Sequence, residues 1–550
     1  MSLHSSAHSD TAIPEETIRV ARAAFPTGTL CMRLRDALGP IFTDEQFADL
    51  FAVRGRPAEA PWRLALITVL HYVENLSDRQ AADAVRGHSD WKYALGLELT
   101  DAGFDYSLLS AFRERLVVHH AEQRLLDAIL GVGTQQGWIK ARGNQRTDST
   151  HIVTAARALN RLECVGETLR AALNALATHA PEWLGTRMPP EWVDRYGHHI
   201  EEYRLPKGEA ERQARATQIG EDGQAVLPWV EEPNTLPELG ALPAIQNLRH
   251  VWEHQYACAT EGLQWRKADD LAPVGQRIDT PYDPDAHYST KRTTSWVGYK
   301  VHLTETCDEH TPHLIVHVLT TPSAERDIQR TLEIEEALTQ QGIPPAEHLV
   351  DAGYTGAKEL LESQSRFGIE LVGPVQADGQ GQAKEVDGIT TRDFVIDWEA
   401  KQARCPQGKV STQWCEHGRA GGPMIASKFA PKDCRACPVR EHCTKMHGRG
   451  RTITVYPQEK HACLQAARQR QTTAEFQRQY AQRSGIEGAY AQGIRVADLR
   501  HARYYGAKKV QVQHLATAAA LDLLRMDAWL QGIPLAQTRI SPLARFKKAA

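Results

Sequence analysis

Hydrophobic residues recur with a helical period from Leu30 to about Gln135. The segments RLALITVLHYVENL, SDRQAADAVRG and SLLSAFRERL place apolar side chains three or four positions apart, which is typical of amphipathic helices. Ser77 is suited to cap the second of these helices. Three short helices could form a helix-turn-helix DNA reader, although small helical bundles serve many other purposes. We predict a flexible tail over residues 1–28 and a helical DNA-binding domain over residues 29–135.

The pattern changes to one of β-strands and helices in the middle of the chain. Apolar residues approach period two in GNQRTDSTHIVTAA, TSWVGYKVHLTET and HLIVHVLTT, and turn residues separate the last two, which predicts a hairpin. A helix (ERDIQRTLEIEEALTQQG), a strand (EHLVDAGYTG), a second helix (AKELLESQSRFG) and a strand (IELVGPV) follow. This order predicts a mixed α/β core in which helices cover a sheet.

Two segments of different character interrupt this core. Residues 161–280 are mostly helical, and residues 381–462 are rich in glycine, cysteine and basic residues with short β runs. Long helices then continue to Trp529. The predicted division is a core in three parts (136–160, 281–380 and the helices of 463–530), a helical insertion (161–280), a cysteine-rich insertion (381–462) and a basic tail (531–550).

Charge and composition narrow the class of protein. The net charge is −4, but basic residues cluster locally, for example at 140–146, 445–451 and 495–509, and local patches set the field that a phosphate backbone meets. The N-terminus has no apolar segment of the signal-peptide kind, and the longest apolar run near it is too short to span a bilayer. We therefore expect a cytoplasmic protein without a membrane partner.

Three acidic residues are candidates for chemistry. Asp148 lies in the first predicted strand, Asp351 ends a later strand, and Glu487 lies in the helical segment YAQRSGIEGAYAQGIR. Carboxylates at the ends of neighbouring strands converge in a crevice, and hard oxygen ligands suit Mg²⁺. Two such ions could clamp the attacking and leaving oxygens of a phosphoryl displacement. The alternative for each acid is a helix cap or a surface charge.

Four sequence blocks together resemble a known family. RTDSTHI, VGYKVHL, LVDAGYTG and YAQRSGIEGAYAQGIR are similar to the blocks of DDE transposases of bacterial insertion sequences, which carry an RNase H-like catalytic domain. The similarity runs from about Leu30 to Leu524 and is greatest to the branch of insertion sequence eleven-eighty-two, within or near the insertion-sequence-four group. It implies that Asp148, Asp351 and Glu487 are the catalytic D, D and E and hold two Mg²⁺.

The helix around the last acid resembles the family signature Y-x2-R-x3-E-x6-K. Tyr480, Arg483 and Glu487 match it, whereas the lysine position is Ile494, with Arg495 next to it. The resemblance implies that Tyr480, Arg483 and Arg495 contact DNA. Lys300 in the strand block could also face DNA, or it could be a solvated strand residue.

The cysteines of the second insertion suggest another metal. Cys405, Cys434, Cys437 and Cys443 include a CxxC pair, and four thiolates suit tetrahedral Zn²⁺ in a structural site. Cys415 and His442 are spare candidates, and an iron–sulfur cluster or reduced buried thiols are the alternatives.

The resemblance implies an enzyme that binds the terminal inverted repeats of an insertion sequence, cleaves the DNA strands and joins them to target DNA. Its partners would be double-stranded DNA and a second copy of the chain in a homodimer, and it would associate with the bacterial nucleoid when acting. Two rival functions remain: an RNase H-like nuclease without strand transfer, and a non-catalytic DNA-binding protein derived from a transposase.

Overall fold

The computed structural model describes residues 11–535 except 53, 56–57, 233–235, 261, 292, 377–386, 420–421 and 447. Most of the predicted basic tail, residues 536–550, therefore lies outside the described residues. None of the described helices is long and apolar enough to cross a membrane.

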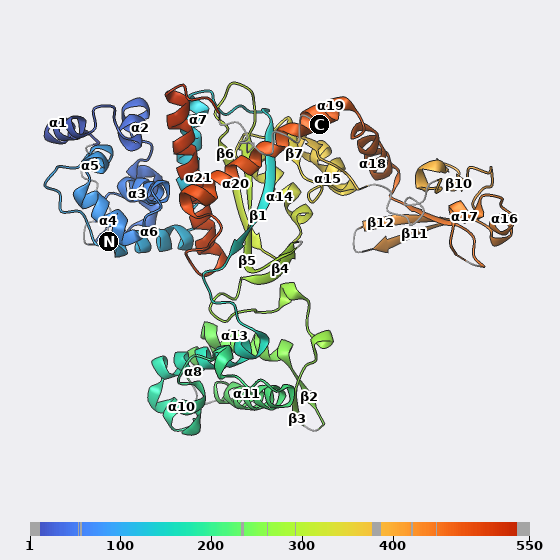
Figure 1. The fold of residues 1–550 in the computed structure, drawn as a ribbon, viewed down its shortest axis with the longest axis horizontal. Helices are drawn as coiled ribbons and strands as arrows, with labels where there is room; N and C mark the ends of the chain where they lie inside the picture. Colours follow the sequence, from blue (N-terminus) through green and yellow to red (C-terminus); the bar gives the residue numbers. More distant parts are fainter. Residues whose placement is uncertain are drawn as a thin grey trace, which may run out of the picture.

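A six-stranded mixed sheet forms the centre of the molecule (Figure 1). Its path runs β4-β5-β1-β7-β8, and β6 pairs with β5. Strands β4, β5, β6 and β1 pair antiparallel, whereas β1, β7 and β8 run parallel. This mixed α/β arrangement confirms the predicted fold class and is compatible with an RNase H-like core. The strands are β1 (Gln145–Val153), β4 (His287–Lys291), β5 (Thr294–Thr306), β6 (Ile315–Pro322), β7 (Glu347–Val350) and β8 (Glu370–Val372).

The two faces of this sheet differ in polarity. On one face the Thr147 hydroxyl lies 2.7 Å from that of Thr304 and 2.7 Å from Nε2 of His348, whose Nδ1 is 3.0 Å from Glu335 of α14. The other face carries apolar residues such as Leu303 and packs against the C-terminal helices α20 and α21. The helical elements of this core are η5 (Asp327–Arg330), α14 (Thr331–Gln340), α15 (Ala357–Glu362), η6 (Ser363–Phe367), α20 (Ile486–Ala497) and α21 (Ala507–Leu530).

The N-terminal helices share one hydrophobic core with the sheet and with α21. Helices α3 and α7 pack on α21, and Arg33 of α2 forms a two-pronged ion pair with Asp527 of α21 at 2.7 and 2.8 Å. Ser77 caps α4 as predicted, in a capping box with Gln80. The elements are α1 (Glu15–Ala24), α2 (Leu30–Leu38), η1 (Asp44–Leu50), α3 (Pro61–Val73), α4 (Asp78–Gly87), α5 (Ser89–Leu95), α6 (Ser107–Val118) and α7 (Arg124–Gln135).

Part of the predicted tail is ordered, and for this part the prediction of a flexible segment was wrong. Residues 15–24 form α1, in which Thr17 and Ala21 are fully buried. The Thr17 hydroxyl donates to the carbonyl of Leu97, and α1 packs on α5. The apolar face of α1 thus finds its partner about eighty residues further along the chain.

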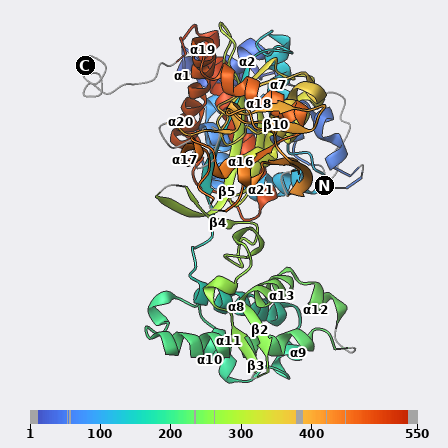
Figure 2. The same cartoon turned by 90° about the vertical axis from the view of Figure 1, so that its right-hand side faces the viewer.

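The helical insertion has a hydrophobic core of its own and projects from one end of the sheet (Figure 2). It also contains a short hairpin, β2–β3, that we did not predict. Its elements are α8 (Arg161–His179), α9 (Pro181–Gly185), α10 (Glu191–Tyr196), η2 (Glu202–Arg204), α11 (Glu209–Trp229), α12 (Pro237–Ala241), α13 (Pro243–Gln255), β2 (Tyr256–Ala259), β3 (Gly262–Trp265), η3 (Ala268–Asp270) and η4 (Val274–Gln276).

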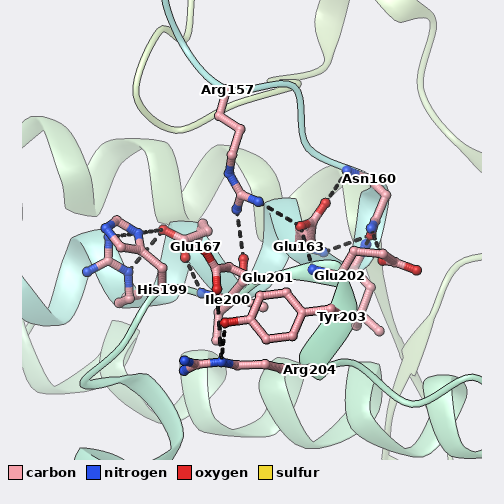
Figure 3. A network of polar contacts seen from close by, with 12 residues as sticks. Arg157, Asn160, Glu163, Glu167, His199, Ile200, Glu201, Glu202, Tyr203 and Arg204 are labelled. Carbon is pink, nitrogen blue, oxygen red and sulfur yellow. Dashed lines mark hydrogen bonds and ion pairs between the residues drawn. The ribbon is translucent and has the colours of Figure 1, made fainter.

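A network of polar contacts fastens the entry into this insertion (Figure 3). The buried Glu163 carboxylate accepts hydrogen bonds from Arg157 and from the backbone N–H groups of Asn160 and Glu202, each at 2.9 Å. Glu167, one turn further along α8, is also buried and pairs with Arg170 at 3.0 Å. Because each buried carboxylate has several donors, their charge is compensated.

The cysteine-rich insertion forms a small module around Phe394, Ala403, Phe429 and Ile453. It projects away from the N-terminal helices and leads into α18 and α19, which return to the sheet (Figure 1). Its elements and these two helices are η8 (Thr391–Asp393), β9 (Val395–Asp397), β10 (Gln402–Arg404), β11 (Gln413–Arg419), β12 (Gly422–Lys428), α16 (Pro431–Arg435), α17 (Arg440–Cys443), β13 (Thr452–Val455), α18 (Gln458–Arg470) and α19 (Ala474–Ala481).

Candidate active site

Asp148 and Asp351 lie next to one another at the centre of the sheet. In the parallel pairing of β1 with β7, Thr147 lies opposite Val350. Asp148 directly follows Thr147, and Asp351 directly follows Val350. Asp351 contributes to a raised pKa of the Asp148 carboxyl, as a neighbouring negative charge does. The adjacency expected of the two acids therefore follows from strand register.

Glu487 approaches this pair from α20, and Arg483 joins it to Asp148. The Arg483 guanidinium donates a hydrogen bond to Oδ2 of Asp148 and lies 3.5 Å from Oε1 of Glu487. The side chain of Arg483 is only 14% exposed, whereas that of Glu487 is 70% exposed. Arg483 thus shields two of the three acids from one another.

Tyr480 completes the cluster. Its ring stacks on Phe476 with a centroid distance of 5.6 Å. Burial raises the pKa of the Tyr480 hydroxyl, Arg483 lowers it, and all three acids, Asp351, Asp148 and Glu487, raise it. Tyr480 therefore lies at the edge of the site, within range of the charges of all three acids.

The electrostatics of Asp148 fit a site for cations. Burial is the main cause that raises the pKa of Asp148, Arg483 acts in the opposite direction, and Asp351 adds to the increase. A half-buried cluster of three carboxylates with one guanidinium carries excess negative charge, and oxygen ligands of this kind suit Mg²⁺. Within the described ranges, no group of three or more His, Cys, Asp or Glu side chains is so placed that it could hold a metal ion. Both predicted metal sites therefore stay predictions.

The remaining two candidates for DNA contact differ in their surroundings. Arg495 is exposed near the end of α20. Lys300 is instead bound to the protein: its ammonium lies 3.0 Å from Asp327 and donates to the carbonyl of Glu325 at 2.6 Å. From the sequence we expected Lys300 either to contact DNA or to be solvated. Neither interpretation included this ion pair.

Asp327 is a residue of this region that sequence reasoning missed. Its Oδ2 accepts from the Ser149 hydroxyl at 3.0 Å. A Cβ placed on Gly353 would lie 2.9 Å from Asp351 Oδ1 and 3.5 Å from Asp327 Oδ2, so the two carboxylates flank the same glycine. No strand or motif marks Asp327 in the sequence, because it starts a short helical turn, η5.

The four cysteines predicted to bind zinc line one cavity of about 290 Å³ in the cysteine-rich module. Burial raises the pKa of the Cys443 thiol, Arg451 lowers it, and Cys434, Cys437 and Cys405 each add to the increase. The spare candidates Cys415 and His442 do not line the cavity. The four cysteines therefore share a cavity but are not arranged in the described residues so that three of them could hold a metal ion, and the zinc site stays a prediction.

Two aspartates that are adjacent in strand register, and a glutamate joined to one of them by Arg483, form the candidate active site of a mixed α/β protein. Comparison with known families makes this more specific. Residues 404–527 match the model of the family described as Transposase DDE domain, and residues 19–115 match that of the Transposase domain (DUF772). The first match includes Glu487 and the four cysteines, whereas Asp148 and Asp351 lie outside both. No curated protein matches the chain.

These two matches support a DDE transposase, an enzyme that acts on DNA. The N-terminal match also covers the second half of α1 and most of the helices that share the core with α21. The matches do not distinguish between branches of insertion sequences.

Proposed function

We propose that the protein is the transposase of a bacterial insertion sequence, of the eleven-eighty-two branch within or near the insertion-sequence-four group. It would bind the terminal inverted repeats, cleave the DNA strands and transfer the 3′ ends to target DNA. The observation that carries this proposal is the adjacency of Asp148 and Asp351 in strand register, with Arg483 joining Asp148 to Glu487, in a sheet compatible with an RNase H-like core.

Each residue of the site has a role in this proposal. Asp148, Asp351 and Glu487 would hold Mg²⁺, which when bound would stabilise the entering and leaving oxygens of the phosphoryl transfer. Arg483 carries the positive charge that neutralises Asp148 in the protein alone, and it would turn to a DNA phosphate as cations take its place. Tyr480 would support Arg483 and the DNA backbone at the edge of the site.

The test uses a labelled DNA duplex that carries the genomic sequence flanking the gene, where the repeats are expected; we call it the end duplex. Asp148→Asn, Asp351→Asn and Glu487→Gln should each lower cleavage more than about a hundredfold, the loss typical of removing a group that stabilises transition-state charge. Binding of the end duplex should remain. Glu475→Gln, an exposed acid on α19, is the matched control and should cleave normally.

The outcomes separate the rival functions. Cleavage without joined products in a strand-transfer assay would identify a nuclease. Binding without cleavage by the unaltered protein would identify a DNA-binding protein that has lost its chemistry. Full activity of any of the three acid variants would refute the assignment of that acid.

We further propose that Cys405, Cys434, Cys437 and Cys443 hold a structural Zn²⁺ that folds the cysteine-rich insertion and takes no part in the reaction. The shared cavity of the four thiols supports this. The active complex would be a homodimer on DNA, because each element has two ends to be joined, and it would act at the nucleoid. Light scattering of the protein with and without the end duplex would test the dimer.

A further inference from the structure

The helix that carries the third acid is broken beside it. Helix α19 ends at Ala481, residues 482–485 form the 3₁₀ turn η9, and α20 begins at Ile486. A 3₁₀ turn has about 3.0 residues per turn instead of 3.6. The turn therefore fixes how Arg483, inside it, and Glu487, just after it, are oriented relative to the sheet.

Arg146 holds this turn from the strand that carries Asp148. Its guanidinium donates to the carbonyl of Gln482 at 2.6 Å and to the Glu305 carboxylate at 2.7 Å. Arg525 of α21 binds the other oxygen of Glu305, also at 2.7 Å. The side chains of Arg146 and Glu305 are 7% and 1% exposed. A guanidinium held in this way is a fixed support, because its planar fork makes several directed bonds.

Gly485 leaves the space that this support needs. A Cβ at residue 485 would overlap the guanidinium of Arg146. The φ angle of Gly485 is −62°, which any residue adopts, so the backbone does not require glycine. The requirement comes from the close approach of Arg146 alone.

Tyr490 holds the same helix on the other side of Glu487. Its hydroxyl donates to the carbonyl of Asp148 at 2.5 Å and accepts from the N–H of Leu303 at 3.2 Å. The side chain is buried. Since Tyr490 lies three residues after Glu487, the two side chains leave α20 about one turn apart.

We propose that Arg146 and Tyr490 are positioning residues that clamp α20 to β1 and so set the place of Glu487 relative to Asp148. The bond from Arg146 of β1 reaches Gln482, five residues before Glu487. The bond from Tyr490, three residues after Glu487, ends on the Asp148 carbonyl of β1. This inference rests on the proposed function, in which both acids hold the same metal ions. Active-site groups must be held within about 0.5 Å of the productive geometry, so loss of either bond impairs metal binding more than DNA binding.

The first test is Gly485→Ala, which displaces the Arg146 guanidinium without removing a functional group. We expect cleavage of the end duplex to fall at least tenfold and the Mg²⁺ concentration for half-maximal rate to rise several-fold, with binding of the end duplex within about twofold of normal. Titration calorimetry with Mn²⁺ on the DNA-free protein should show at least fivefold weaker binding. Gly131→Ala is the matched control, because a Cβ on this helical glycine meets no atom within 4 Å.

A double-mutant cycle isolates the contact. Arg146→Lys keeps the positive charge beside Glu305 but removes the planar head that the new methyl group would overlap. Adding Gly485→Ala to Arg146→Lys should therefore cost less activity than adding it to the unaltered protein, since residues in contact are not additive.

Tyr490→Phe keeps the proposal testable if Gly485→Ala does not fold. The variant retains the ring and loses only the hydrogen bonds of the hydroxyl, which also lies 3.3 Å from the carbonyl of Val301. It should show the same higher Mg²⁺ requirement with end-duplex binding unchanged. Tyr256→Phe is its control, a buried tyrosine that donates to the Ala216 carbonyl at 2.8 Å in the helical insertion, and its cleavage should match that of the unaltered protein.

Normal cleavage and a normal Mg²⁺ requirement in Tyr490→Phe or in folded Gly485→Ala overturn the clamp. So does a fall in end-duplex binding that accounts for the whole loss of activity. These results differ from a failure of the proposed function, in which Asp148→Asn itself would cleave normally.

Discussion

Replacing Arg495 with alanine should weaken binding to the end duplex and make that binding less sensitive to salt. Arg495 is exposed on α20, and it lies eight residues after Glu487, a little over two turns of helix. It therefore lies about 80° around the helix from the acid, on the adjoining part of the helix surface. Its guanidinium can reach a phosphate of DNA that enters the site, in the place of the lysine that the family signature would put at Ile494.

The expected magnitude follows from counterion release. Each phosphate contact adds about 0.9 to the slope of log affinity against log salt. Loss of one contact should make this slope shallower by about 0.9. The ratio of the dissociation constants of the variant and the unaltered protein should therefore decrease about 3.5-fold between 50 and 200 mM salt. Partial unfolding of the variant would lower the affinity without this dependence on salt concentration.

Fluorescence anisotropy of the end duplex at four salt concentrations measures the slope. The control is Arg187→Ala, in the helical insertion, where Arg187 is already paired with Glu232 at 2.9 Å and its removal should leave the slope unchanged. An Arg495→Ala protein with the slope and strand-transfer activity of the unaltered protein would refute the contact and leave Arg495 a solvated helix residue.

Three further predictions concern the rest of the chain. Cys437→Ser should lower the zinc content measured by elemental analysis from about one equivalent to much less, and it should lower the stability of the cysteine-rich module. Unaltered protein that contains no zinc after purification without chelators would contradict the metal site. Arg33→Ala should lower the free energy of unfolding by roughly 1–3 kcal/mol, because Asp527, 9% exposed, loses its partner, and an unchanged denaturant midpoint would contradict this. Burial lowers the pKa of His317 to about 4, so between pH 6.5 and 4 the unfolded chain binds more protons at this residue than the folded protein does. The free energy of unfolding therefore decreases as the pH is lowered, by about 2 kcal/mol at pH 5. His317→Leu should reduce this loss when denaturation is compared at pH 7.5 and 5.

The strands and two of the acids were accessible to sequence reasoning because their signals are local. Alternating apolar residues marked β5 and β6, and the hairpin between them is present. Asp148 lies within one β-prone run and Asp351 directly follows another, and the parallel register of these runs brings the two acids together.

What the sequence did not reveal depends on partners that are distant in the chain. The 3₁₀ turn before Glu487 is held by Arg146, more than three hundred residues earlier, so helical periodicity alone predicted an unbroken helix. Lys300 is bound to Asp327 in a short turn that has no pattern of its own. Helix α1 had a recognisable acidic first turn, but the polar residues before it suggested a tail.

The distribution of charge indicates where DNA approaches. Residues 161–280 contain 19 acidic and 12 basic residues, whereas residues 381–462 contain 14 basic and 9 acidic ones, so the net charge of −4 conceals two insertions of opposite sign. A DNA backbone is repelled by the first and attracted by the second. Because the cysteine-rich module leads through α18 and α19 directly to Arg483 and Glu487 (Figure 1), we expect the duplex to run along this side of the sheet. The helical insertion projects elsewhere (Figure 1) and keeps an excess of negative charge, so we do not expect the duplex to contact it.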